Sequence, residues 1–376
     1  MSGKRRKGVF VLTAAGGLLV TPRPAVAQPA PPISSDPGVG AAAVDGDIFN
    51  LGGNFVGDAQ EEIFQYRAGT GADFLWTFSK VGGVLQATPF SYSVDTVYEP
   101  VVGDFDGDGY DDIFWHGPGT VPELIWDFSG GFTPTVVTPA GSANLTYVIV
   151  AGDFTGDGAD DVLFYRAGTG NDSIWDFEPG TEFSFTGSLT PLPLNNTYVP
   201  VAGTFTGDGA ADVVWYDPGS ATDYMWDFVP AATPTMTSPV VGPIDGESYK
   251  PFTVDRRNDG RDDIFWYTPE SGTDPYWDHR PAGRVDDLYT VTGTFWPGTG
   301  DLFGDGNDDI LWEGAEESFI WDYEPAVDGG FTLTIWDFGR SLAAAADAAF
   351  AAEGASAAEP GTVTITATES TTIVSG

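Results

Sequence analysis

Aspartates recur at a regular spacing in one short stretch of the chain, GDFDGDGYDDIFW (103–115). Counted from the first aspartate as position 1, positions 1, 3, 5 and 9 are Asp104, Asp106, Asp108 and Asp112, and the backbone carbonyl of Tyr110 falls at position 7. Alternate residues of a tight turn can direct their oxygens at one centre. Such an oxygen set suits a hard divalent cation, and calcium fits best. The stretch therefore predicts a calcium-binding loop.

Other interpretations of this stretch fit less well. Magnesium demands stricter geometry and fewer protein ligands, and zinc prefers His or Cys. An EF-hand needs Glu at position 12, where this chain has Trp115. Asp-Gly pairs also form simple hairpin turns, but converging carboxylates would repel one another without a cation. Gly107 and Gly109 allow the positive φ angles that a wrapped loop needs.

The pattern of this stretch is repeated along the chain. Six related segments span 53–66, 103–116, 152–165, 203–216, 253–267 and 300–313. Each is followed by a tryptophan in a similar phrase, at Trp76, Trp126, Trp175, Trp226, Trp277 and Trp321. A period of about 50 residues with several strand signals in each unit predicts a β-propeller. We expect an all-β domain of about six four-stranded blades over 45–340, or seven if one unit is unrecognisable.

The strand signals are clear within each unit. In the third unit they fall at 146–152, 160–167, 172–177 and 182–192. One such sheet cannot bury both faces alone, but blades arranged around an axis can. The first and last units both look complete, so no strand exchange is expected to close the ring. After the propeller comes an Ala-rich tail (341–376) that could be helical in part. Its segment 362–374 alternates like a strand, and could either pair with the propeller or stay separate.

The first 27 residues have the pattern of a secretory signal peptide. A basic start (4–7) precedes an apolar run (8–20), and the small residues AVA precede Gln28. A short membrane anchor is the alternative, although the run is short for a bilayer. A linker rich in Pro, Gly and Ser follows at 28–44. No later segment is long and apolar, so we expect an extracellular or cell-surface protein without membrane insertion.

The charge and composition of the chain limit the classes of binding partner that can be expected. The chain has 15 basic and 55 acidic residues, and removal of the signal would leave 10 basic residues and a formal charge of −45. This excess disfavours nucleic acid and anionic membranes and favours cations, although it could also serve solubility in a saline habitat. The chain has no cysteine. Bound metal could therefore stabilise the fold in place of disulfides.

The segments DFDGDGYDD and DFTGDGADD resemble the calcium loops of the FG-GAP/VCBS repeat family, found in integrin α-subunits and many secreted bacterial proteins. The resemblance implies a propeller with mainly structural calcium between the first two strands of some blades. Transferred residue by residue, it gives full ligand sets in the second unit and near-full sets in the third. The third set is Asp153, Thr155, Asp157, the Ala159 carbonyl and Asp161.

The remaining units depart from the pattern. The fourth set has only two carboxylates and should bind weakly: Thr204, Thr206, Asp208, the Ala210 carbonyl and Asp212. Position 3 is Val56 in the first unit, Arg257 in the fifth and Phe303 in the sixth, which puts calcium in doubt there. The Arg257 guanidinium could stand in for metal by pairing with the neighbouring acids Asp255 and Asp259.

The repeated aromatic residues favour packing between blades over a sugar-stacking surface, because blade cores require them in every unit. No catalytic constellation is evident: the only histidines are His116 and His279, and there is no Cys nucleophile and no G-x-S-x-G elbow. We therefore expect a monomeric binding or adhesion module rather than an enzyme, with an extracellular protein or glycan ligand at variable loops such as 116–123 and 217–223. The alternatives are an extracellular carbohydrate-active enzyme with a carboxylate pair at the channel mouth, and a structural component of the cell envelope.

Overall fold

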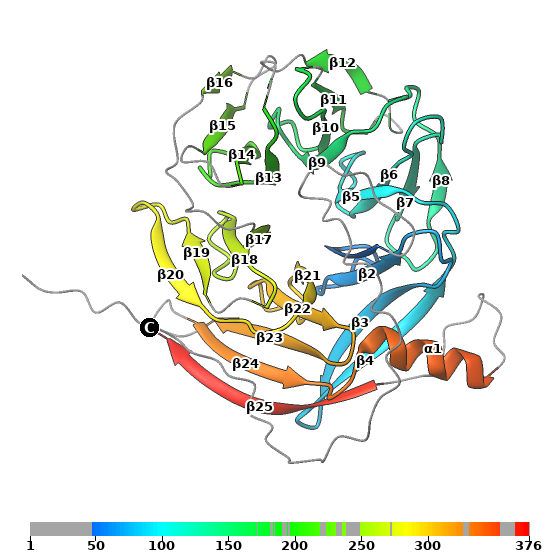
Figure 1. Cartoon of the computed structure of the whole chain (residues 1–376), viewed down its shortest axis with the longest axis vertical. Helices are drawn as coiled ribbons and strands as arrows, with labels where there is room; N and C mark the ends of the chain where they lie inside the picture. Colours follow the sequence, from blue (N-terminus) through cyan, green and yellow to red (C-terminus); the bar gives the residue numbers. More distant parts are fainter. Residues whose placement is uncertain are drawn as a thin grey trace, which may run out of the picture.

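Six blades of four antiparallel strands stand around a central channel as a propeller (Figure 1). Four blades are separate sheets, and the first and last are joined into one nine-stranded sheet by a C-terminal strand. The structure is a computed structural model that describes residues 47–375 apart from 171, 181–182, 184, 190–193, 195, 219–222, 231–234, 238–248, 271–272, 326–330 and 354–364. The predicted signal peptide (1–27) and linker (28–44) lie outside these residues. The six-bladed prediction is confirmed, and each blade consists of four consecutive strands.

The strands of the six blades have the following bounds. Blade 1 consists of β1 (Ile48–Gly53), β2 (Glu62–Arg67), β3 (Asp73–Val81) and β4 (Val84–Tyr92). Blade 2 consists of β5 (Glu99–Gly103), β6 (Asp112–His116), β7 (Leu124–Asp127) and β8 (Thr135–Val137). Blade 3 consists of β9 (Val148–Gly152), β10 (Asp161–Tyr165), β11 (Ser173–Phe177) and β12 (Phe185–Leu189). Blade 4 consists of β13 (Val199–Gly203), β14 (Asp212–Tyr216), β15 (Tyr224–Val229) and β16 (Thr235–Thr237). Blade 5 consists of β17 (Lys250–Val254), β18 (Asp263–Tyr267), β19 (Asp274–Asp278) and β20 (Val285–Tyr289). Blade 6 consists of β21 (Phe295–Gly300), β22 (Asp309–Gly314), β23 (Ser318–Pro325) and β24 (Phe331–Asp337).

The first strand of each blade lines the channel, and the second is buried between neighbouring blades. Every residue of β6, β10, β14, β18 and β22 is buried, as expected for short apolar strands covered on both faces. The acidic stretches connect these two strands. In blade 2, for example, Gly103 pairs with Asp112 and the loop lies between them. All six acidic loops therefore lie at the same end of their blades.

The repeated aromatic residues form the packing between blades, which confirms that interpretation. Trp115 is 1% exposed and lies edge-on to Tyr66 of blade 1, with ring centroids 4.9 Å apart. It also contacts Trp126 of its own blade at 5.2 Å. Trp215, Trp266 and Trp312 are fully buried in the same way. These side chains hold the blades together and are not available to stack on a sugar.

The C-terminal tail closes the ring at its rim. The helix α1 (Leu342–Glu353) follows blade 6, and the strand β25 (Ile365–Ser375) pairs with both β24 and β4, so it bridges the last and first blades (Figure 1). Leu342, Ala346 and Ala367 join one core with residues of both blades. The tail segment thus pairs with the propeller, one of the two possibilities that the sequence left open. The expectation that no shared strand closes the ring is wrong, because the outer edges of β4 and β24 both pair with β25. Within the residues described, no helix is long and apolar enough to cross a membrane.

Candidate metal-binding loops

Six loops join the first and second strands of the blades, and we call them loop 1 (54–62), loop 2 (104–112), loop 3 (153–161), loop 4 (204–212), loop 5 (255–263) and loop 6 (301–309). In loop 2, carboxylate oxygens of Asp104, Asp106 and Asp108 all lie within 4.8 Å of one another. No other described group of three or more His, Cys, Asp or Glu side chains meets this criterion. Gly107 (φ 72°) and Gly109 (φ 93°) make the two left-handed turns that bring the carboxylates together.

Backbone hydrogen bonds hold the loop 2 carboxylates in place. The N–H groups of Asp108 and Gly109 donate to the two oxygens of Asp104, at 3.0 and 2.9 Å. The Tyr110 N–H donates to Asp108 Oδ1 at 2.9 Å. The chain thus wraps around its own first aspartate, which places positions 1, 3 and 5 on one side of the turn. Tyr110 is half-buried in the same loop.

Asp112 gives the strongest indication that a cation belongs here. It is 2% exposed, and its Oδ1 accepts a hydrogen bond from the Phe128 N–H at 3.0 Å. Its Oδ2 is buried and has no hydrogen-bond partner in the described part of the chain. Burial, with the added charge of Asp106, raises the pKa of Asp112 to about 9. A carboxylate held in this way needs either a proton or a cation, and a hard divalent cation fits the oxygen donors present.

The backbone of loop 3 wraps around its first aspartate as in loop 2, but both oxygens of its position-9 carboxylate already accept hydrogen bonds. Asp153 accepts hydrogen bonds from the N–H groups of Asp157 (3.1 Å) and Gly158 (2.9 Å). Thr155 is buried, and its hydroxyl lies 3.4 Å from Asp153 Oδ1. Asp161 differs from its counterpart in loop 2. Its two oxygens accept backbone N–H groups at 3.0 Å each, although burial and Asp176 still raise its pKa to about 9.

Loop 4 lacks the acidic cluster, in agreement with its poor ligand set. Asp208 is exposed and Ala210 is buried. Asp212 is buried and accepts the N–H groups of Thr206 (3.0 Å) and Phe228 (3.1 Å). The remaining position, Thr204, is half-buried. An arginine of the next blade also reaches this loop, because Arg261 Nη1 donates to the carbonyl of Phe205 at 3.0 Å.

Loop 1 is organised by hydrogen bonds alone. Oε2 of Glu62 accepts the N–H groups of Phe55 (3.1 Å) and Val56 (3.2 Å). Oδ1 of Asn54 accepts the N–H of Gly57 at 3.1 Å. These contacts close the turn around Glu62, whose pKa is raised by burial to about 8, and Val56 supplies no side-chain ligand at position 3.

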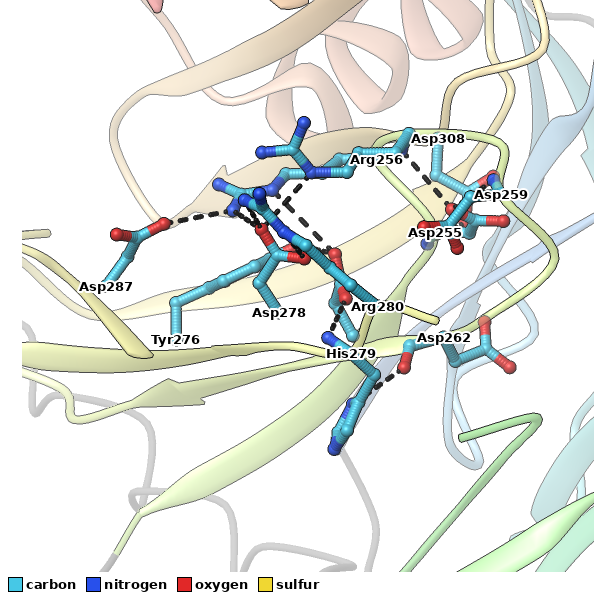
Figure 2. Close-up of polar contacts among 12 residues, drawn as sticks. Asp255, Arg256, Asp259, Asp262, Tyr276, Asp278, His279, Arg280, Asp287 and Asp308 are labelled. Atoms are coloured by element: carbon cyan, nitrogen blue, oxygen red, sulfur yellow. Dashed lines mark hydrogen bonds and ion pairs between the residues drawn. The ribbon is translucent and has the colours of Figure 1, made fainter. Parts of the chain in front are cut away.

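Loop 5 contains arginine where the other loops have apolar residues (Figure 2). Arg256 occupies position 2, which is a buried Phe in loops 1 to 4. Its guanidinium is buried, and Nη2 lies 2.9 Å from Asp278 and 3.1 Å from Asp287. Arg257 Nε lies 3.2 Å from the same Asp278. The buried guanidinium of this loop therefore belongs to Arg256, which the sequence analysis did not single out, and Arg257 reaches an acid outside the loop.

The aspartate of the repeated Trp-Asp pair is a second residue type that sequence analysis missed. It is present in blades 2 to 6 as Asp127, Asp176, Asp227, Asp278 and Asp322. In each blade its charge adds to burial in raising the pKa of the position-9 carboxylate. Every one of these loops therefore has an additional acid beside it. The recurrence of the pair was visible in the sequence, but its proximity to the loop depends on strand pairing.

Acids at position 8 form a third set, and they link neighbouring blades. Each accepts the backbone N–H of position 1 in the preceding blade. The pairs are Asn54 with Asp111 (2.7 Å), Asp104 with Asp160 (2.9 Å), Thr204 with Asp262 (2.6 Å), Asp255 with Asp308 (2.7 Å) and Asp301 with Glu61 (3.3 Å). Between blades 3 and 4 the residue is Ala211, and only the backbone bond to the Asp153 carbonyl (2.7 Å) remains. In the sequence these residues are visible as two adjacent acids at positions 8 and 9 of every loop except loop 4.

Comparison with protein families agrees with this geometry. A model described as FG-GAP-like repeat matches residues 104–164, which contain loops 2 and 3. The segment with loops 2 and 3 is therefore similar to an FG-GAP-like repeat, and the other blades share its strand order. Among curated proteins the chain has no match.

Two solved structures resemble this propeller at low identity. A mutant of NanB sialidase from Streptococcus pneumoniae aligns with a TM-score of 0.31 at 9% identity, over 80% of this chain and 54% of that chain. The chain thus spans about half the length of the sialidase. The V. cholerae biofilm matrix protein Bap1 aligns with a TM-score of 0.25 at 10% identity, over 80% of this chain and 81% of that chain.

Two other regions of the propeller bear on ligand binding. The channel has a volume of about 370 Å³, and its lining includes Pro100, Pro200, Pro251 and Pro297 with small apolar residues, none of them titratable. The expected ligand loop 116–123 buries both of its ends, because His116 and Glu123 are each 1% exposed and lie 3.3 Å apart. Of the other expected loop, 219–222 lie outside the described residues.

Proposed function

We propose that this protein is an exported, calcium-binding propeller that acts as a binding or adhesion module for an extracellular protein or glycan. The observation that carries the calcium part is the unpartnered, buried Oδ2 of Asp112 beside the cluster of Asp104, Asp106 and Asp108. The ligands would be these four carboxylates and the carbonyl of Tyr110. Bound calcium would neutralise the loop and fix the connection between β5 and β6.

Loop 3 is the second calcium site in this proposal, through Asp153, Thr155, Asp157, the Ala159 carbonyl and Asp161. The support is its shared backbone wrap and the match of the FG-GAP-like repeat over 104–164. We expect weaker binding than in loop 2, because backbone N–H groups already occupy both oxygens of Asp161. Loop 4 should not bind appreciably.

Calorimetric titration of the chelator-treated protein with calcium tests the metal part. Asp108→Ala should abolish the tightest site, and Asp208→Ala, which removes the equivalent acid of loop 4, is the matched control and should leave binding unchanged. Equal calcium uptake by wild type and Asp108→Ala would refute the assignment of loop 2.

The binding role needs its own experiment. In this proposal the chain is not an enzyme. Glycan and extracellular-matrix protein arrays probed with and without calcium should give specific, reproducible binders. No binding on either array, together with turnover on a polysaccharide panel, would favour the carbohydrate-active alternative instead.

A further inference from the structure

Loops 5 and 6 differ from loop 2 in one respect that the sequence pattern does not show: in each, the Trp-Asp aspartate beside the loop is paired with a basic side chain of the protein. In loop 6 this side chain comes from another blade. Lys80, on β3 of blade 1, places Nζ 2.6 Å from Asp322 Oδ2 and 2.9 Å from Glu324 Oε1 of blade 6. Its ammonium also lies 4.1 Å from the centre of the Phe303 ring. Phe303 is the residue that replaces the position-3 ligand.

In the Lys80–Asp322 ion pair the carboxylate is buried, whereas the lysine side chain is partly exposed. The Asp322 side chain is 0% exposed and that of Lys80 is 28% exposed. The Trp336 indole N–H donates to the same Asp322 oxygen at 2.8 Å. Asp322 is the Trp-Asp aspartate of its blade, equivalent to Asp127 beside loop 2. A buried carboxylate of this kind requires a positive partner, and Lys80 supplies it.

Loop 5 repeats the arrangement within one blade (Figure 2). Asp278, the equivalent aspartate, is 0% exposed and is paired with Arg256, Arg257 and Arg280. The Arg256 guanidinium also lies 3.8 Å from Asp263 at position 9 and stacks on Tyr276 at 3.9 Å. The guanidinium thus neutralises the Trp-Asp aspartate and approaches position 9, whereas Asp255 at position 1 accepts the backbone N–H groups of Asp259 and Gly260.

Loops 2 and 3 lie in a part of the chain that has almost no basic residues. Arg166 is the only lysine or arginine between residues 81 and 249, and it lies at the opposite end of β10 from loop 3. No ion pair with a basic side chain is found for the acids of loops 2 and 3 among the described residues. Loops 2 and 3 thus differ from loops 5 and 6 in that the chain provides a paired cation only beside the latter.

We propose that Lys80 is the resident cation of loop 6 and Arg256 that of loop 5, so that these residues determine which repeats bind metal, and the seam between blades 6 and 1 is held without it. This inference rests on the proposed function, since the resident cations take the role that calcium takes in loops 2 and 3. It separates loops 2 and 3, which depend on metal, from loops 5 and 6, which do not.

A double-mutant cycle in chelator tests the role of Lys80 independently of calcium. Lys80→Met keeps the aliphatic stem over Phe303 but removes the charge, and should lower the thermal midpoint by several degrees. Lys80→Met/Asp322→Asn removes both charges, keeps an acceptor for Trp336, and should recover most of that loss. An unchanged midpoint in Lys80→Met, or no recovery in the double variant, would overturn the inference.

A gain-of-site variant tests specificity. Lys80→Met/Phe303→Asp gives loop 6 acids at positions 1, 3, 5 and 9 and frees it of its ammonium. Calorimetry should show one more calcium equivalent than wild type, and calcium should restore the thermal midpoint. No added equivalent, in a wild type that binds calcium, would overturn the specificity role. If wild type binds no calcium, the proposed function fails, whereas the cycle in chelator still decides the role of Lys80.

Discussion

Lys80 Nζ and Asp322 Oδ2 lie 2.6 Å apart, although the two residues belong to the first and last blades of the propeller. The same seam is covered at the rim by β25, which pairs with β4 and β24, and is packed inside by residues of α1. Arg67 of β2 adds a bidentate ion pair to Asp347 of α1, at 2.7 and 2.8 Å. The junction between the ends of the propeller is therefore closed by side chains, helix and strand together.

A change in β25 should weaken this seam. Ala367 is 1% exposed within the core shared by blades 1 and 6, whereas its neighbour Thr366 is exposed. Ala367→Asp buries an unpaired carboxylate and should cost more than about 3 kcal/mol of unfolding free energy. Thr366→Asp adds the same charge at the surface and should cost little. Denaturant unfolding measures both, and equal costs would mean that β25 does not contribute to the fold in solution.

Asp112→Asn should have opposite effects on the protein with and without calcium. The variant keeps an acceptor for the Phe128 N–H but loses the buried charge. In chelator it should be as stable as wild type or more stable, because the uncompensated carboxylate is gone. With calcium it should be less stable, since wild type gains about 2.7 kcal/mol when calcium is at 100 times its Kd.

Asp161→Asn is the matched control for that variant. Both oxygens of Asp161 accept backbone N–H groups, so an amide would oppose one donor with another. The substitution should destabilise the protein in chelator as well as in calcium. Thermal unfolding of the two variants side by side would contradict this account if Asp112→Asn also lost stability in chelator.

The position-8 acids should differ in their effect on calcium. Asp160→Ala leaves the Asp104 N–H, at the first position of loop 2, without its acceptor, and should cost about 1–3 kcal/mol of stability and weaken calcium binding. Asp308→Ala removes the same contact at Asp255 in loop 5 and should cost a similar amount without changing calcium affinity. Calorimetric titrations that changed equally in both variants would show that these acids do not position the metal ligands.

Glu61 should make stability depend on pH. Burial, followed by the charge of Asp111, raises its pKa from 4.5 to about 7. A pKa raised on folding gives stability that is present below the unfolded value and is lost as pH rises through 7. In chelator, wild-type stability should therefore fall between pH 5 and pH 8, and Glu61→Gln should reduce that fall by at most about 3 kcal/mol.

Glu316→Gln provides the control for charge alone. It removes the same charge from an exposed position and should leave the pH dependence as in wild type. If Glu61→Gln and Glu316→Gln gave the same slope of unfolding free energy against pH, the Glu61 prediction would be wrong.

Much of the fold could be predicted from the sequence, because the repeat specifies it locally. The tryptophan period gave the number of blades, and apolar runs such as 112–116 identified the buried second strands. The wrap of loop 2 followed from its alternating aspartates and two glycines. Each of these signals depends on neighbouring residues within one unit, which is why a single sequence reveals them.

The charge partners of the loops could not be predicted in this way. Lys80 lies in a strand of blade 1 and meets Asp322 only when the ring closes, and no motif connects them. Arg256 was overlooked because its position in the other loops is apolar, and Arg257 occupied the position where a ligand was expected. The pairing of β25 with β4 likewise joins segments far apart in the chain.

The position of β25 in the chain also has a consequence for the order of folding. Blades 1 to 6 can each form from consecutive strands as the chain is synthesised, but the outer edges of β4 and β24 stay unpaired until residues 365–375 are made. Unpaired edges can join to those of other chains, and such long-range closure is slow. The high negative charge of the chain would keep nascent copies apart during that interval.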